Sequence, residues 1–242
     1  MDYWFWSIGL LVGAVVGFSK CGLPGLGIIS VPLLILIFDA KAAVGVITPI
    51  FICGDIMSLI RYRQHADWSK LWRLSPGLLI GMIIGGFVFL HINSSVLRPL
   101  LGILILLLVV MQVITSKLKM DDVPDHPAFV WSMGGAAGFA TTVGNVAGPI
   151  MSIYLLAVRF SKEKFIGTGA WYYFIINCMK VPLYVFAGEI TFETLRFNVC
   201  VVPGIIGGAL LGWWLLPYIS RRIFDHAVLV LAAVGGLWLI FG

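Results

Sequence analysis

The chain has 242 residues, of which 60% are hydrophobic and 11% are charged. A soluble domain has about twice that fraction of charged residues, so the composition excludes an ordinary soluble domain. Apolar runs recur from one end to the other and predict a multi-spanning α-helical protein of the lipid bilayer. The net charge of +5 does not indicate nucleic-acid binding, because most of it falls in loops on one side of the predicted spans.

Ten apolar segments follow one another along the chain. They cover residues 4–19, 24–38, 42–60, 76–92, 97–116, 128–142, 146–158, 165–187, 197–216 and 224–241. Four of these segments are short: the first, the second, the sixth and the seventh. A glycine-rich joint separates the first from the second, and another separates the sixth from the seventh. The joints are GFSKCGLPGLG, residues 17–27, and GFATTVGNVAGP, residues 138–149. Neither is typical of a water-exposed loop, so we predict that each forms the tip of a broken or re-entrant helical hairpin.

The positions of lysine and arginine indicate whether the chain reverses at these joints. If it does, eleven basic residues fall on one side of the membrane and three on the other, with Lys20 and Lys180 inside it. If each joint is a kink within one span, the count becomes seven against seven. Because cytoplasmic loops carry an excess of basic residues, we expect reversal at both joints and both termini on the non-cytoplasmic side.

The second half of the chain repeats the first. The residues that match at an offset of 121 positions are Gly13, Gly17, Phe18, Gly27 and Lys41 with Gly134, Gly138, Phe139, Gly148 and Lys162. Asp55 matches Asn177 one position further on. We therefore predict a five-segment repeat over 1–116, a cytoplasmic linker over 117–127 and a second repeat over 128–242. An odd number of segments makes the repeats inverted, as in many secondary transporters.

The chemistry of the joints favours an anion. A segment that begins at a tip directs its free N–H groups and positive dipole end into the membrane, Lys20 adds a charge, and neither joint contains a carboxylate. A metal site needs carboxylates, imidazoles or thiolates, and the four cysteines show no paired spacing, so we expect no metal and no cofactor. The candidate substrate-binding residues at the joints are Ser19, Lys20, Gly22, Thr141, Thr142 and Asn145.

Three further polar residues lie inside predicted spans, where an ionisable group suggests function. Asn177 and Lys180 share one face of a helix, and we expect both to line the pathway, unless Lys180 extends outward to the membrane surface. Asp55 is the candidate for taking up a proton during transport, although a pair with Arg61 or Arg63 is an alternative. A structural pair between Lys20 and Asp55 is also open.

Several features have ordinary structural interpretations. Trp171, Tyr172 and Tyr173 could line a pathway, but packing is the expected role. Glycines four positions apart let helices approach closely, and they suit a homodimer as well as internal packing. They are Gly81, Gly85, Gly208 and Gly212. No HExxH, GxSxG, CxxC or Walker motif occurs, so an intramembrane enzyme or a scaffold is a less favoured class than a transporter.

Two repeats that each open with a glycine-rich broken hairpin resemble the sulfite exporter TauE/SafE family. The similar stretches are GFSKCGLPGLGIISVPLL at 17–34, GNVAGPIMSIYLL at 144–156 and NCMKVPLY at 177–184. The resemblance implies a fold of this kind in the cell inner membrane and transport of sulfite, an organosulfonate or a related sulfur oxyanion. We expect a secondary transporter that works by alternating access, with a passive anion channel as the alternative.

Overall fold

The computed structural model describes residues 3–22, 26–117, 127–157, 160, 162–215 and 221–241. Every regular element in these ranges is helical, as the sequence predicts. The first half contains α1 (Tyr3–Cys21), the 3₁₀ turn η1 (Leu26–Ile29), α2 (Ser30–Ile35), α3 (Ala40–Tyr62), the 3₁₀ turn η2 (Arg63–His65), α4 (Trp68–His91) and α5 (Ser94–Lys117). The second contains α6 (Pro127–Gly144), α7 (Gly148–Ala157), α8 (Lys162–Phe186), α9 (Phe192–Leu215) and α10 (Arg221–Phe241). Of the predicted linker 117–127, residues 118–126 lie outside the described residues.

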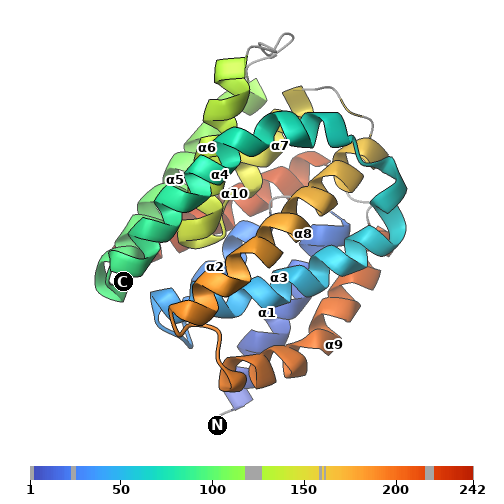
Figure 1. The fold of residues 1–242 in the computed structure, drawn as a ribbon. Coiled ribbons are helices and arrows are strands. Elements are labelled where there is room, and N and C mark those ends of the chain that lie inside the picture. The colour runs from blue at the N-terminus through green and yellow to red at the C-terminus, as the bar shows by residue number, and fades with distance from the viewer. Residues whose placement is uncertain are drawn as a thin grey trace.

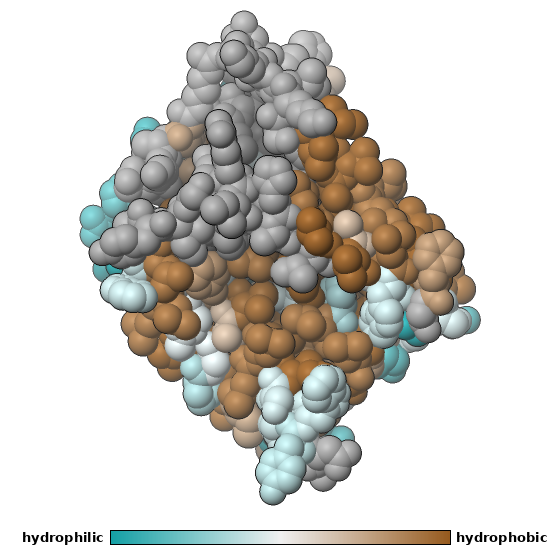
Figure 2. All heavy atoms as spheres, turned by 180° about the vertical axis from the view of Figure 1, so that it is seen from behind, coloured by the Kyte–Doolittle hydropathy of each residue, from teal (hydrophilic) through white to brown (hydrophobic). Residues whose placement is uncertain are grey.

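Five of the described helical stretches are long and apolar enough to cross a membrane. They are Tyr3–Cys21, Ala40–His65, Trp68–His91, Ser94–Met111 and Phe192–Leu215. Their outer surfaces carry large apolar side chains, and Ile83, Val199 and Trp214 are each more than half exposed, at 72%, 69% and 67%. Apolar side chains cover much of the face in Figure 2. Such a surface suits lipid rather than water, so the chain is a multi-pass membrane protein.

The helices pack in pairs across the two halves of the chain. In Figure 1, α3 and α8 lie side by side at the centre, and α1 pairs with α9, α4 with α6, and α5 with α10. In the predicted repeats α6 corresponds to α1 and α9 corresponds to α4, so the α1–α9 and α6–α4 pairs are equivalent. The α3–α8 and α5–α10 pairs each join a helix to its own counterpart in the other repeat. This pattern agrees with the repeat found in the sequence, whereas its inverted orientation stays a prediction.

Contacts between turns show how the chain reverses. The Phe5 and Phe38 rings lie 5.6 Å apart, so the first hairpin returns to the face on which α1 begins. On this first face Ser94 donates a hydrogen bond of 2.9 Å to Asp39. On the opposite, second face the Asp67 amide donates to Thr168 at 2.9 Å. The reversal predicted at the first joint is therefore confirmed, and which face is cytoplasmic stays a prediction.

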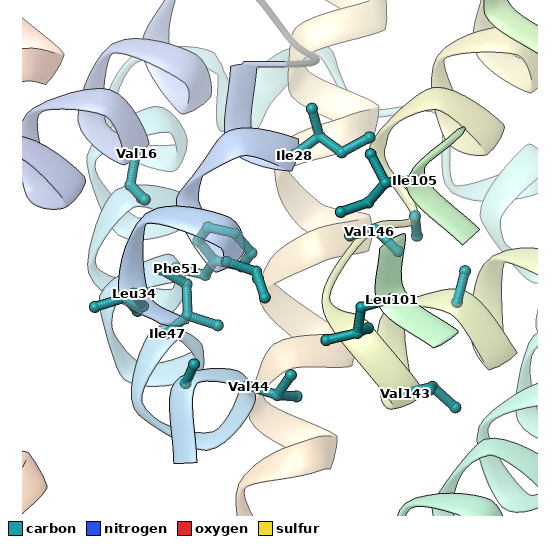
Figure 3. Packing of buried hydrophobic residues seen from close by; sticks show 14 of the residues in the cluster. Val16, Ile28, Leu34, Val44, Ile47, Phe51, Leu101, Ile105, Val143 and Val146 are labelled. Carbon is teal, nitrogen blue, oxygen red and sulfur yellow. The ribbon is translucent and has the colours of Figure 1, made fainter. Parts of the chain in front are cut away.

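Apolar side chains fill the space around the two joints. Figure 3 shows Val16, Ile28, Leu34, Val44, Ile47, Phe51, Leu101, Ile105, Val143 and Val146 in this cluster. They come from both halves of the chain and from four segments besides the joints themselves. Because interiors are close-packed, this cluster holds the broken backbone of each joint in a defined place.

Glycines allow the two equivalent helix pairs to touch backbone to backbone. A Cβ atom built on Gly208 would lie 2.0 Å from the Ala14 carbonyl oxygen, and one on Gly81 would lie 2.0 Å from the Gly135 carbonyl oxygen. Ala14 and Gly135 are 121 positions apart, so the contact is the same in both halves. The predicted role of these glycines in close helix packing is what the structure shows.

Adjacent glycines in α9 provide a test of this packing. Gly208→Leu is expected to lower stability by about 1–3 kcal/mol or more, because its side chain would displace α1. Gly207→Leu is the matched control, because a Cβ at Gly207 meets nothing within 4 Å. Unfolding in an SDS titration measures both variants. Equal stability of the two variants would contradict the packing described here.

Candidate functional site

A cavity of about 70 Å³ lies where the two joints meet. It has space for roughly five water molecules, at about 10–15 Å³ each, and so suits a small solute. The first joint and η1 contribute Ser19, Lys20, Gly27 and Ile28, the second joint and α7 contribute Asn145, Val146, Ala147, Gly148, Ser152 and Leu155, and Thr141 comes from α6. The walls are completed by Phe51, Asp55 and Ser58 of α3 and by Phe165, Ile166, Gly169, Ala170, Tyr173 and Asn177 of α8.

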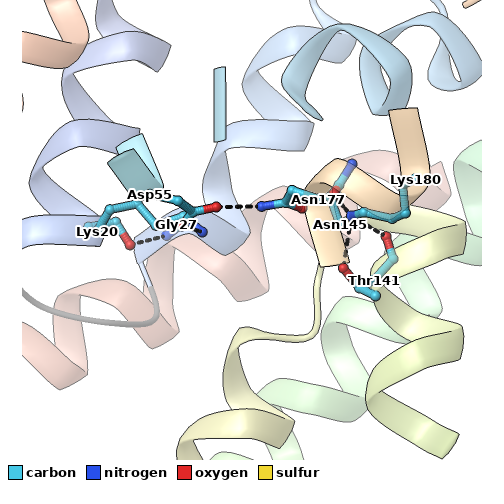
Figure 4. Close-up of polar contacts among 8 residues, drawn as sticks. Lys20, Gly27, Asp55, Thr141, Asn145, Asn177 and Lys180 are labelled. Atoms are coloured by element: carbon cyan, nitrogen blue, oxygen red, sulfur yellow. Dashed lines mark hydrogen bonds and ion pairs between the residues drawn. The ribbon is translucent and has the colours of Figure 1, made fainter. Parts of the chain in front are cut away.

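One wall carries a chain of polar contacts from α1 through α3 to α8 (Figure 4). Lys20 Nζ lies 2.6 Å from Asp55 Oδ1, and Asn177 Nδ2 donates to Asp55 Oδ2 at 2.7 Å. Asp55 is fully buried, and the Lys20 side chain is 11% exposed. Asp55 thus pairs with Lys20 rather than with Arg61 or Arg63, so the structural pair that the sequence left open is present.

Aromatic rings and a serine surround the Lys20 ammonium group. Nζ lies 4.1 Å from the centroid of the Tyr173 ring and 4.8 Å from that of Phe51, both within cation–π range. Ser19 Oγ accepts a hydrogen bond of 3.0 Å from the Gly27 amide. The Ser19 hydroxyl proton is therefore directed elsewhere, and a hydroxyl on the cavity wall can donate it to a solute.

The second joint is held by a separate network. Lys180 Nζ donates to Thr141 O at 3.1 Å, to Thr141 Oγ1 at 2.9 Å and to Asn145 Oδ1. The Asn145 side-chain amide donates to Val44 O at 2.9 Å and to Thr48 Oγ1 at 3.1 Å. Asn145 has a φ of 58°, a left-handed conformation that asparagine tolerates better than most residues.

This network ends α6 and orients α7. The last carbonyl groups of a helix lack intrahelical partners and form its negative end. Lys180 places an ammonium group at that end, and the Tyr184 hydroxyl donates to Thr142 O at 2.8 Å. Lys180 is 1% exposed, so it does not extend to the membrane surface. Its contacts with α6 and the second joint hold the first turn of α7 at the cavity.

The buried charges of this region do not balance when lysine and aspartate carry their usual charges. Lys20 and Lys180 provide two positive charges, and Asp55 is the one buried carboxylate in the part of the chain that the structure describes. Ion pairs inside a membrane protein are strong only when each charge has a partner. Lys180 lies outside the cavity wall and is held by Thr141 and Asn145, so the charges that a solute meets at the wall are those of Lys20 and Asp55.

Six of the nine predicted site residues line the cavity: Ser19, Lys20, Asp55, Thr141, Asn145 and Asn177. Three others lie nearby but outside its wall. Gly22 packs on α9, where a Cβ would lie 3.1 Å from Gly212 Cα. Thr142 donates to Gly138 O, and Lys180 holds the second joint.

The beginning of the second segment differs from the prediction. It forms the 3₁₀ turn η1 followed by the six-residue helix α2, so no α-helix N-terminus from this segment faces the cavity. Tyr173, expected to serve in packing, lines the cavity beside Lys20. Ser58 and Ser152 were missed. Ser58 lies three positions after Asp55 and thus on the same helix face, which is the signal that would have found it.

The comparison with protein families agrees with the architecture. The family described as "Sulfite exporter TauE/SafE" matches residues 8–239, nearly the whole chain. The chain belongs to this family. The TauE/SafE family is one of membrane transporters, in agreement with the apolar helices described above. Comparison with curated proteins and with solved structures gives no match.

Proposed function

We propose that this TauE/SafE protein is a secondary transporter of a small sulfur oxyanion, such as sulfite or an organosulfonate. The observation that carries the proposal is a cavity that is lined by both broken joints and has the Lys20 ammonium group in its wall. Broken helices around a central site are the usual design of secondary transporters. The family description supports a sulfur oxyanion as the substrate.

The donors around the cavity match the needs of an oxyanion. Lys20 supplies charge, and the Ser19 hydroxyl supplies a neutral donor. The helix α7 begins at Gly148, where a Cβ atom would meet nothing within 4 Å, so a solute can approach its first turn closely. Pro149 has no N–H group, so the Gly148 amide and the positive dipole end of that turn are what attract negative charge. The anion binds between α1 and α7 in this proposal.

Asp55 couples a proton to the anion. When Asp55 is ionised, its negative charge neutralises that of Lys20. The Asp55 carboxylate would then also repel an entering anion. When Asp55 accepts a proton, the Lys20 charge becomes available to the anion, and the group of three carries no net charge. A buried site favours this neutral arrangement. Anion and proton are therefore expected to move together, so a proton gradient should accelerate anion uptake.

The position of the cavity supports alternating access as the mechanism in this proposal. Its α8 wall runs from Asn177 back to Phe165, towards the second face of the molecule. On the other side the second joint is bonded to α3 and α8 through Asn145 and Lys180. Rocking of one half against the other would break these contacts and open the cavity to the first face.

A ligand screen tests the substrate class. Purified protein is heated in the presence of sulfite, thiosulfate, methanesulfonate, sulfate or acetate, each over a range of concentrations. A bound ligand stabilises the folded protein by mass action, so we expect a rise in the melting temperature with sulfite or methanesulfonate that is larger than the rise with acetate. If no sulfur oxyanion shifts the melting temperature more than acetate does, the proposed substrate class is wrong.

Counterflow separates a transporter from a passive anion channel. Proteoliposomes loaded with unlabelled sulfite are diluted into labelled sulfite, and uptake is compared with that of empty vesicles. A transporter exchanges substrate across the membrane, so internal sulfite is expected to accelerate the uptake of label. Equal initial rates with and without internal sulfite would favour a channel.

A further inference from the structure

Ser58 lies in the cavity wall, and its hydroxyl group has no hydrogen-bond partner among the residues that the structure describes. Its relative exposure is 1%, and it contributes to the cavity lining. Its Oγ atom has no hydrogen-bond partner within the described ranges of the chain. Burying an unpaired hydroxyl group costs free energy, so such groups in folded proteins call for an explanation.

Two other buried hydroxyl groups inside the helices of this protein, those of Thr48 and Thr142, do find partners. Thr48 Oγ1 donates to the carbonyl group of Val44 at 3.1 Å, and Thr142 Oγ1 donates to that of Gly138 at 2.8 Å. Each of these bonds returns to the carbonyl group four residues earlier, the common solution for a buried hydroxyl in a helix. Ser58 makes no such bond, although it lies in the same helix as Thr48.

Ser58 follows Asp55 by three positions and lies on the same face of α3. It therefore shares the cavity wall with the Lys20–Asp55 pair. We propose that the Ser58 hydroxyl donates a hydrogen bond to an oxygen atom of the bound sulfur oxyanion and helps to select it. This inference rests on the proposed function and adds a specificity-determining residue to the same site.

The selection follows from the directions of the donors. Lys20 and Ser19 line the cavity from α1, Gly148 lines it from the start of α7, and Ser58 lines it from α3. A sulfite or sulfonate head carries three oxygen atoms that point in different directions, and donors on three walls can serve all three. A planar carboxylate has only two oxygen atoms, so it gains less from the third wall. Ser58 thus favours sulfonates over carboxylates.

The test compares Ser58→Ala with Ser30→Ala, using methanesulfonate and acetate as probes. Ser30 is the matched control, because its Oγ is also buried and without a partner in the described part of the chain, but Ser30 does not line the cavity. Dissociation constants come from calorimetry, and melting temperatures are measured without ligand. Ser58→Ala is expected to weaken methanesulfonate binding about tenfold, the effect of one hydrogen bond to a charged group, and to change acetate binding little. Ser30→Ala should leave both dissociation constants unchanged.

Stability separates a binding role from a structural one. Removing an unpaired buried hydroxyl should leave the ligand-free melting temperature unchanged or raise it in both variants. If Ser58→Ala does not fold, Ser58→Cys takes its place in the test. Its side chain is of similar size but is a weak hydrogen-bond donor, so the same loss of affinity is expected. Wild-type affinity for methanesulfonate in the folded Ser58 variants would overturn the role of Ser58 and leave the proposed function standing. Failure of the wild-type protein to bind either sulfite or methanesulfonate would overturn both.

Discussion

Lys20→Gln is expected to abolish transport and to destabilise the protein. The substitution leaves Asp55 fully buried with Asn177 as its remaining partner. Removing one member of a buried ion pair costs about 3–5 kcal/mol, because the other charge stays without compensation. Loss of transport alone would therefore not show whether Lys20 contacts the substrate or only holds α1 to α3.

The double variant Lys20→Gln/Asp55→Asn separates these roles. It removes both charges and keeps side chains of similar shape that can hydrogen-bond to each other, so stability should return to within about 2 kcal/mol of the wild-type value. Anion uptake should stay absent, because the cavity wall no longer carries an ammonium group. SDS titration measures the stability, and proteoliposome uptake of labelled sulfite measures transport. Uptake by the double variant at the wild-type rate would reduce Lys20 and Asp55 to a structural pair.

Lys180→Met is the second substitution with a large expected effect. The ammonium group serves three oxygen atoms of Thr141 and Asn145, and leaving a buried polar group without its partner costs about 1–3 kcal/mol. We expect a stability loss of at least that size and a loss of transport, because the second joint no longer holds α7 at the cavity.

Controls for Lys180 come from the same network and from the surface. Asn145→Ala should reproduce the loss of transport, because Asn145 connects Lys180 to Val44 and Thr48 of α3. Lys41→Met should change stability by less than about 1 kcal/mol, since Lys41 is partly exposed and its cation lies over the Phe89 ring. A Lys180→Met protein that is as stable and as active as Lys41→Met would contradict the role given to this network.

The broken helices and the reversal at the first joint could be predicted from the sequence because they rest on strong signals. Glycine-rich joints inside apolar segments mark broken helices, and the repeat identifies the two joints as equivalent. The distribution of basic residues predicts reversal, which the contact between Phe5 and Phe38 confirms at the first joint. The match of Asp55 with Asn177 indicates that both face the centre, where they are hydrogen-bonded to each other.

The partners of the two lysines could not be predicted in the same way. In the sequence, Lys20 and Lys180 look alike, because each is a lysine within an apolar segment. In the structure, Lys180 donates to the side-chain amide oxygen of Asn145, a residue with a left-handed backbone. Lys20 instead pairs with the carboxylate of Asp55. No local pattern specifies these choices, because they depend on how α3 and α8 pack at the centre. Ser58 escaped notice because a serine in a helix usually bonds to its own backbone.

The most direct test of the account is sulfite uptake by a protein whose cavity has been filled. Gly148→Leu places a side chain at the cavity wall, where a Cβ meets nothing within 4 Å. Gly207→Leu adds the same side chain outside the cavity, at a position where a Cβ also meets nothing within 4 Å. Uptake of labelled sulfite into proteoliposomes is measured for both variants and the wild type, with folding confirmed by SDS titration. We predict that Gly207→Leu transports like the wild type and that Gly148→Leu is folded but transports less than about one tenth as fast, a rise of about 1.4 kcal/mol in the activation free energy of transport. Sulfite uptake by folded Gly148→Leu at the wild-type rate would contradict the claim that the substrate passes through this cavity.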